Sequence, residues 1–200
     1  MDLNIKNIKG YYPFKILGVH LANCTMDSSE FTFGKITGSY IYGILSRNDV
    51  MVSNCRIKIT NETCIRGANV LVINCRFLSG GSGGTDRIID IMGNCTYIAC
   101  EFDGIYFAHG VEGTSLMRYI DCKFLNVGSN RAIYTNYNNA TNLKLIIRNC
   151  HFEVNNAAYT PICRYRYNPT KTIISNCTTN ATAMHSLTSG VTENNNMTAW

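Results

Sequence analysis

The sequence predicts an all-β fold in which short parallel strands coil into a solenoid of about seven turns. Three observations support this prediction: a short motif that ends in cysteine recurs seven times, apolar and polar residues alternate around each cysteine, and the recurring segments are rich in Ile, Val, Tyr, Phe, Thr and Asn. A helical repeat can have a similar period, but these segments lack the Ala, Leu, Glu and Lys that favour helix interiors.

The motif reads apolar residue, variable residue, Asn, Cys, as in Val72-Ile73-Asn74-Cys75. Successive cysteines are separated by 31, 20, 25, 22, 28 and 27 residues, which are lengths typical of one unit in a stacked repeat protein. The seven cysteines are Cys24, Cys55, Cys75, Cys100, Cys122, Cys150 and Cys177.

Each copy of the motif contains two short predicted strands, one before and one after the Asn position. Apolar residues predominate five and three residues before the cysteine, at the cysteine, and two residues after it, whereas the residue directly after the cysteine is polar. This alternation predicts strands with one buried face and one face in water. Buried positions are two residues apart within each strand, but three residues apart just before the cysteine. We therefore expect the chain to bend there.

The bend position is Asn in five copies and Asp121 in a sixth. Asn and Asp are the residues that most readily adopt a left-handed backbone and form hydrogen bonds within their own turn. In the remaining copy the position is Ala99, for which we expect a different local geometry.

The unit Ile-x-Asn-Cys-x-Phe, as in Val72–Phe77 and Tyr119–Phe124, resembles the right-handed parallel β-helix of the pectate-lyase-like superfamily and of phage tailspikes. The resemblance implies a β-helix over residues 15–180, preceded by a lead-in strand over 1–14 and followed by a tail or docking arm over 181–200. It also implies side-by-side homotrimers. Proteins of this superfamily include lyases, hydrolases and structural proteins, so the fold leaves the activity open.

The ends of such a solenoid need polar caps, since an uncapped end leaves backbone groups unpaired. Neither terminus contains an amphipathic helix that could cap it. We therefore expect the chain to stack on other virion subunits or to form part of something longer.

Ten cysteines invite a disulfide or zinc interpretation, and both fit poorly. Equivalent side chains on stacked strands lie about 4.8 Å apart and point the same way, whereas a disulfide needs converging β-carbons about 3.8 Å apart. The sequence also lacks a Cys-x-x-Cys pair, which zinc sites often contain. We expect reduced core thiols, no metal and no cofactor, with Cys163 the most exposed.

Composition narrows the choice of partners. The formal charge is +5 and the 18 Lys and Arg are scattered, so nucleic acid is disfavoured. No run of about 18 apolar residues predicts a membrane span, and Met1–Lys6 lacks the order of an export signal.

Acidic and basic residues are densest between residues 85 and 112. If the chain is an enzyme, general acids and bases would come from this region, because glycoside hydrolysis needs paired carboxylates. Ala108-His109-Gly110-Val111 and Arg56-Ile57-Lys58 resemble polygalacturonase motifs, but their order is reversed and the other elements are absent. The sequence therefore favours a surface without catalysis. The candidates are Asp86, Asp90, Glu101, Asp103 and His109.

A second candidate surface alternates Tyr and Arg between two prolines. Exposed Tyr and Arg are common at protein interfaces and sugar-binding surfaces. The tyrosines could equally well continue the stack of inward-facing side chains in the sixth coil. The candidate glycan- or partner-binding residues are Tyr159, Arg164, Tyr165, Arg166 and Tyr167.

The fold resemblance favours a phage or viral structural protein, part of a tail spike, fibre or other virion appendage assembled in the host bacterial cytoplasm. Its role would be to present a rigid lateral surface to a host polysaccharide or a virion subunit. A fragment of a polysaccharide lyase or glycoside hydrolase is the first alternative, and a bacterial surface adhesin is the second.

Overall fold

The computed structural model describes most of the strands of the chain. The described residues are 15–16, 19–22, 25–27, 44–46, 49–59, 62–66, 69–79, 87–90, 94–109, 116–128, 131–135, 143–164 and 169–198. Side chains are described in 51–57, 69–79, 94–105, 116–128, 131–134, 143–163 and 169–198. Within these residues the regular structure consists of β-strands alone, and no helix could span a bilayer.

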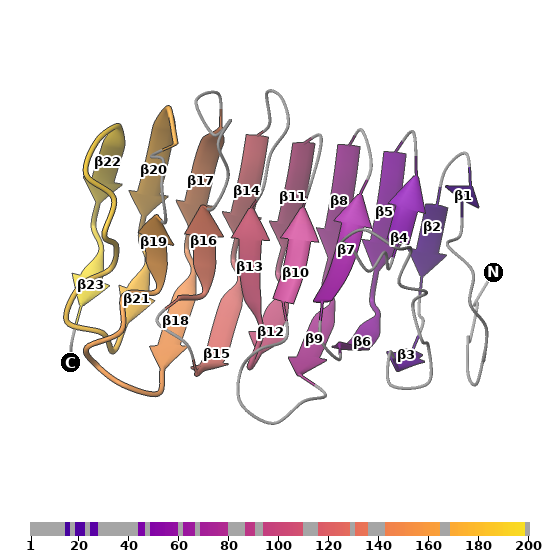
Figure 1. Ribbon diagram of the computed structural model, residues 1–200, viewed down its shortest axis with the longest axis horizontal. Helices are drawn as coiled ribbons and strands as arrows, with labels where there is room; N and C mark the ends of the chain where they lie inside the picture. Colours follow the sequence, from indigo (N-terminus) through magenta and orange to yellow (C-terminus); the bar gives the residue numbers. More distant parts are fainter. Residues whose placement is uncertain are drawn as a thin grey trace.

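Three sheets contain all the strands (Figure 1). The 7-stranded sheet consists of β1 (Lys15–Ile16), β4 (Ile44–Ser46), β7 (Glu62–Arg66), β10 (Arg87–Asp90), β13 (Tyr106–His109), β16 (Ile133–Thr135) and β19 (Ile162–Arg164). One 8-stranded sheet consists of β2 (Val19–Ala22), β5 (Asp49–Ser53), β8 (Asn69–Ile73), β11 (Asn94–Ile98), β14 (Leu116–Ile120), β17 (Lys144–Arg148), β20 (Lys171–Ser175) and β22 (Val191–Asn194). The other consists of β3 (Thr25–Asp27), β6 (Arg56–Ile59), β9 (Arg76–Ser79), β12 (Glu101–Asp103), β15 (Lys123–Val127), β18 (His151–Val154), β21 (Thr178–Thr179) and β23 (Met197–Thr198).

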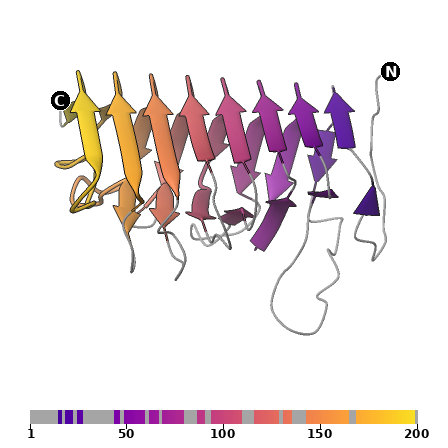
Figure 2. The same cartoon turned by 90° about the horizontal axis from the view of Figure 1, so that it is seen from above.

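Within each sheet, neighbouring strands are parallel and come from successive passes of the chain. For example, β8 pairs with β5 on one side and β11 on the other, with Val72 in register with Val52 and Tyr97. The strands of the sheet that contains β8 lie in one row along the long axis of the molecule (Figure 2). The prediction of an all-β fold with parallel strands is confirmed, and the arrangement is compatible with a β-solenoid.

The predicted buried positions are confirmed wherever the side chains are described. Five and three residues before each cysteine, at the cysteine and two residues after it, the side chains are buried, whereas the residue after the cysteine is exposed or half-buried. Aromatic rings stack directly over one another in this core. Phe124 lies between Phe102 and Phe152, with ring centroids 4.9 and 4.7 Å apart, and Tyr97 stacks on Tyr119 at 5.2 Å.

The cysteines are part of this core and are reduced, as predicted. All eight cysteines whose side chains are described are free thiols, and seven of them are buried. Cys163 is the exception, with intermediate exposure. The repeat thiols also bond the backbone: the Cys100 sulfur donates to the carbonyl of Ile98 over 3.3 Å. Each thiol thus behaves as a small apolar side chain that closes its own bend.

The bend before each cysteine is left-handed, as the Asn pattern predicts. The φ angles of the bend residues lie between 50° and 55° in the six described copies of the motif. The expectation for Ala99 is wrong, since its φ is 52° and matches those of the Asn residues. Its amide donates to Ile120 O over 2.9 Å, as Asn74 N donates to Ile98 O. The strands on both sides therefore impose the bend, although a left-handed alanine costs about 1 kcal/mol or more.

The segment after residue 189 adds a further strand to each 8-stranded sheet. β22 pairs with β20, and β23 pairs with β21, through a left-handed bend at Asn195. In this last copy Asn196 occupies the cysteine position, where its side chain accepts from Cys177 N at 3.0 Å and donates to Ile174 O at 3.1 Å. The carboxyl-terminal segment therefore continues the parallel pairing of both 8-stranded sheets with polar side chains.

Candidate functional site

An open groove of about 650 Å³ follows the line of bends between the sheets that contain β8 and β9. Its rims are formed by the bend residues and by the residues that directly follow the cysteines, because both sets are in register from strand to strand. Cys55, Cys75 and Cys100 line it between the two rims, and each of these residues is no more than 3% exposed. The repeat itself therefore builds this groove.

One rim of the groove is a ladder of side-chain amides. Each amide nitrogen donates to the oxygen of the preceding bend: Asn74 to Asn54 at 2.8 Å, Asn149 to Asp121 at 2.9 Å, and Asn176 to Asn149 at 3.2 Å. Because the bends share one geometry, the same contact recurs at each step. Ala99 has no group to donate, so it interrupts the ladder between Asn74 and Asp121.

The other rim is a row of charged side chains, one from each strand. Arg56, Arg76, Glu101 and Lys123 are in register on β6, β9, β12 and β15. Within the part of the chain that the structure describes, Arg56 and Lys123 form no ion pair. Adjacent strands are about 4.8 Å apart, so these two unpaired cations are about 14 Å apart along the groove.

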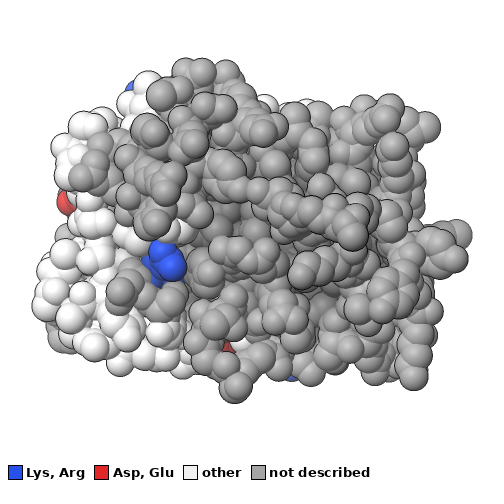
Figure 3. Space-filling model, in the orientation of Figure 1, with Lys and Arg blue, Asp and Glu red and all other residues white. Residues whose placement is uncertain are grey.

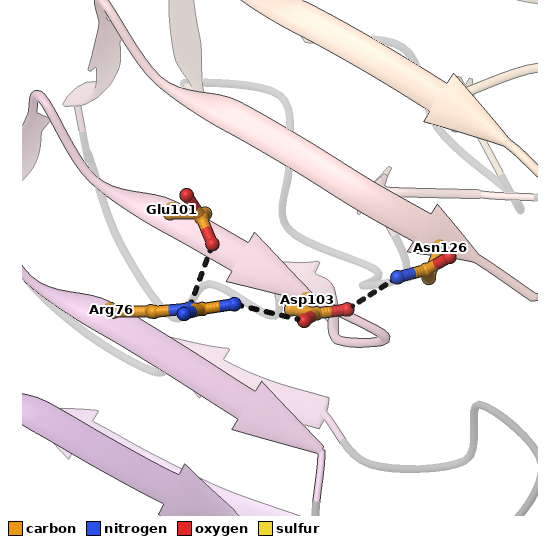
Figure 4. A network of polar contacts seen from close by, with 4 residues as sticks. All are labelled: Arg76, Glu101, Asp103 and Asn126. Atoms are coloured by element: carbon orange, nitrogen blue, oxygen red, sulfur yellow. Dashed lines mark hydrogen bonds and ion pairs between the residues drawn. The ribbon is translucent and has the colours of Figure 1, made fainter.

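Two of the predicted acid and base candidates are engaged in an ion-pair network (Figure 4). Arg76 Nε lies 2.7 Å from Glu101 Oε1, and its Nη2 lies 3.4 Å from Asp103 Oδ2. Asn126 Nδ2 donates to the other oxygen of Asp103 at 2.7 Å. Both carboxylates therefore share one guanidinium, and Asp103 is also held by Asn126.

Asp90 and His109 are in register on the neighbouring strands β10 and β13 of the 7-stranded sheet. Glu101 and Asp103 belong to another sheet. The structure thus brings together two of the five candidates in one place and two in another, and Asp86 lies outside the described residues. The side chains of Asp90 and His109 are not among those described.

The Tyr and Arg candidates are described only in part. Tyr159 is half-buried and packs against the core. Arg164 ends β19, with its backbone alone described, and Tyr165, Arg166 and Tyr167 lie outside the described residues. In the view of Figure 3 the described side chains form a surface with few charges.

The chemistry available in the groove is recognition by hydrogen bonds and charge. The neighbouring Cys100 thiol, together with burial of the sulfur, raises the pKa of Cys75 to about 12, so this thiol stays protonated and is a poor nucleophile or metal ligand. Among the described residues, no three His, Cys, Asp or Glu side chains gather as metal ligands would. The sequence analysis missed the groove, although the column of Asn-Cys pairs was its signal.

Comparisons with protein-family models, with curated proteins and with solved structures found no match for this chain. The function must therefore be inferred from its own residues and geometry.

Proposed function

We propose that this chain is a right-handed parallel β-helix that forms part of a phage or viral virion appendage, such as a tail spike or fibre. Its role is mechanical display: it presents a stiff lateral surface to a host polysaccharide or to a neighbouring virion subunit. The observation that carries the proposal is the unbroken parallel stacking of strands in all three sheets around one apolar core. Such a rod resists bending because each strand inside a sheet is bonded to a strand on both sides.

The contacts of the carboxylates support a surface without catalysis. Glu101 and Asp103 share Arg76, and Asp121 accepts a hydrogen bond within the ladder. Reduced thiols also suit a particle that is assembled in a bacterial cytoplasm, where disulfides are rare. Display of a lateral surface fits side-by-side association, and we propose a homotrimer.

Two measurements test this proposal. The genes that flank the coding sequence should encode capsid and tail proteins, and flanking genes for secreted sugar metabolism would contradict a virion role. In solution, light scattering should give three times the chain mass of 22.3 kDa. A monodisperse monomer at micromolar chain concentrations would contradict the proposed homotrimer.

One observation favours a second candidate, a polysaccharide lyase or glycoside hydrolase. Asp90 and His109 occupy equivalent positions on adjacent parallel strands, which places their Cα atoms about 4.8 Å apart. Asp and His are residue types that act as general acids and bases. Release of reducing ends from capsular polysaccharides by the parent chain, lost in Asp90→Asn and His109→Ala, would establish this activity, whereas no turnover by the parent removes it.

A further inference from the structure

Ala99 destabilises its bend in two ways, through backbone strain and through a missing ladder hydrogen bond. Ala99 holds a left-handed backbone, with φ at 52°, which Asn or Gly would adopt more easily. An Asn there would also donate one ladder hydrogen bond to Asn74, of the kind that Asn74 donates to Asn54. Strain of this kind persists in proteins chiefly where the site serves a function.

The interruption leaves room and hydrogen-bond acceptors in the groove. We call the space over Ala99, between Asn74 and Asp121, the Ala99 notch. The amide oxygen of Asn74 receives no donor from the described residues, because the donor would come from position 99. On the far side the carboxylate of Asp121 accepts from Asn149 through Oδ1, and its second oxygen is a further acceptor. A ligand in the notch must therefore donate hydrogen bonds in both directions.

The rest of the groove supplies donors. Arg56 and Lys123 lie at its two ends without ion-pair partners among the described residues, and Arg76 lies between them. A group that only donates, such as an ammonium, would meet these cations unfavourably. A group that only accepts, such as a carboxylate, would meet Asp121 and Glu101. Hydroxyl groups both donate and accept, so they match a surface on which acceptors and donors alternate.

The dimensions also suit a chain of hydroxyl-bearing rings. A volume of about 650 Å³ lies within the range of small-ligand sites, which is roughly 300–1,000 Å³. The lining residues follow the direction in which the strands stack, from Arg56 to Lys123, so a linear ligand can lie along the groove.

We propose that the Ala99 notch binds one unit of a neutral saccharide, whose hydroxyls donate to Asn74 and Asp121, while hydroxyls of the neighbouring units accept from Arg56 and Lys123. This proposal rests on the proposed role as a polysaccharide-facing virion surface and deepens it by naming the site and the ligand class. The missing side chain at position 99 is then a specificity feature, because any ladder-forming residue would occupy the space of the sugar.

The experiment compares saccharide binding by variants at position 99. The probes are maltotetraose, cellotetraose and chitotetraose as neutral oligosaccharides, and tetragalacturonate as an acidic one. Binding is followed by saturation-transfer NMR and quantified by titration. At least one neutral probe should bind the parent chain saturably.

Ala99→Asn should weaken that binding at least tenfold, while it raises the urea midpoint of unfolding because Asn adopts the left-handed bend more easily and donates to Asn74. This opposite movement excludes misfolding as the cause of lost binding. Ala99→Gly keeps the notch open and should bind like the parent. Ala158→Asn is the matched control, since it adds the same side chain at an exposed position outside the groove.

Three results would overturn the proposal: no saturable binding of any neutral probe by the parent, equal binding by the parent and Ala99→Asn, or binding of tetragalacturonate alone. If instead Ala99→Asn dissociates an oligomer seen by light scattering, the notch holds a second copy of the chain rather than a sugar. Each of these results leaves the virion role intact, because gene neighbourhood tests that role independently.

Discussion

The side chain of Asn149 donates a hydrogen bond of 2.9 Å to the carboxylate of Asp121, and thereby joins two bends that are 28 residues apart in sequence. Asn149 also accepts from Asn176 on the next bend. One residue type thus serves the backbone and the ladder together, since it tolerates the left-handed conformation and bonds both neighbours.

Replacing Asn149 separates these two roles. Asn149→Ala should lower the free energy of unfolding by about 2 kcal/mol, because it loses two exposed hydrogen bonds and places alanine in a left-handed bend. Asn149→Gly loses the same bonds without the backbone strain and should lose less. Urea unfolding monitored by circular dichroism measures both. Equal losses in the two variants would show that backbone strain contributes nothing.

The central phenylalanine of the aromatic stack should dominate core stability. Phe124 is fully buried between Phe102 and Phe152. Phe124→Ala should therefore cost about 3–5 kcal/mol, as a large cavity in a rigid core does. Phe124→Leu fills most of that space and should cost less than half as much. A loss below about 1 kcal/mol for the alanine variant would mean that the stack collapses around the cavity.

The thiol at position 75 predicts a pH dependence of stability. Its pKa is raised to about 12 in the folded chain, against 9.0 as the ordinary value. Above about pH 9 the unfolded chain releases this proton and the folded chain retains it, so the stabilisation is complete below pH 9 and is lost as the pH rises toward 12. Cys75→Ala should flatten the decline in urea midpoint between pH 8 and 10.5. An unchanged slope would show that Cys75 ionises equally in both states.

The last strand pair should depend on one amide. Asn196 satisfies the backbone nitrogen of Cys177 and the carbonyl of Ile174. Asn196→Ala leaves both groups without these partners, so we expect a loss of about 1–3 kcal/mol. Hydrogen exchange should show faster exchange at β20–β23 than in the parent, with β8 and β11 unchanged. Asn194→Ala, an exposed neighbour, should have little effect and serves as the control.

Much of the fold was predictable because the sequence consists of repeated units with the same pattern of apolar positions. Positions such as Val72, Cys75 and Phe77 repeat their chemistry in copy after copy, and burial follows directly. Ala99 was predicted wrongly because a local preference was applied where the neighbouring strands decide the backbone. The strands after residue 189 were missed for a different reason, since Glu193 and Asn196 put polar groups at positions that are apolar elsewhere.

The candidate site was less predictable, because a groove depends on which side chains are in register rather than on which are close in sequence. Glu101 and Asp103 were correctly noticed as a charged cluster, but their partner Arg76 precedes them by a full repeat. Pairing of Asp90 with His109 likewise depends on the exact length of the connection between their strands. Composition alone predicts neither the ion pairs of Arg76 nor the register of Asp90 with His109.

The polar strand pair at the carboxyl end has a consequence for how long the molecule can grow. A further copy stacked on β22 and β23 would have to cover Glu193, which instead contacts His185 within its own chain. Burying that charge is unfavourable, so filament formation through this end is discouraged even though its backbone edge is open. The polar side chains of this strand pair therefore disfavour end-to-end stacking of a second copy on β22 and β23.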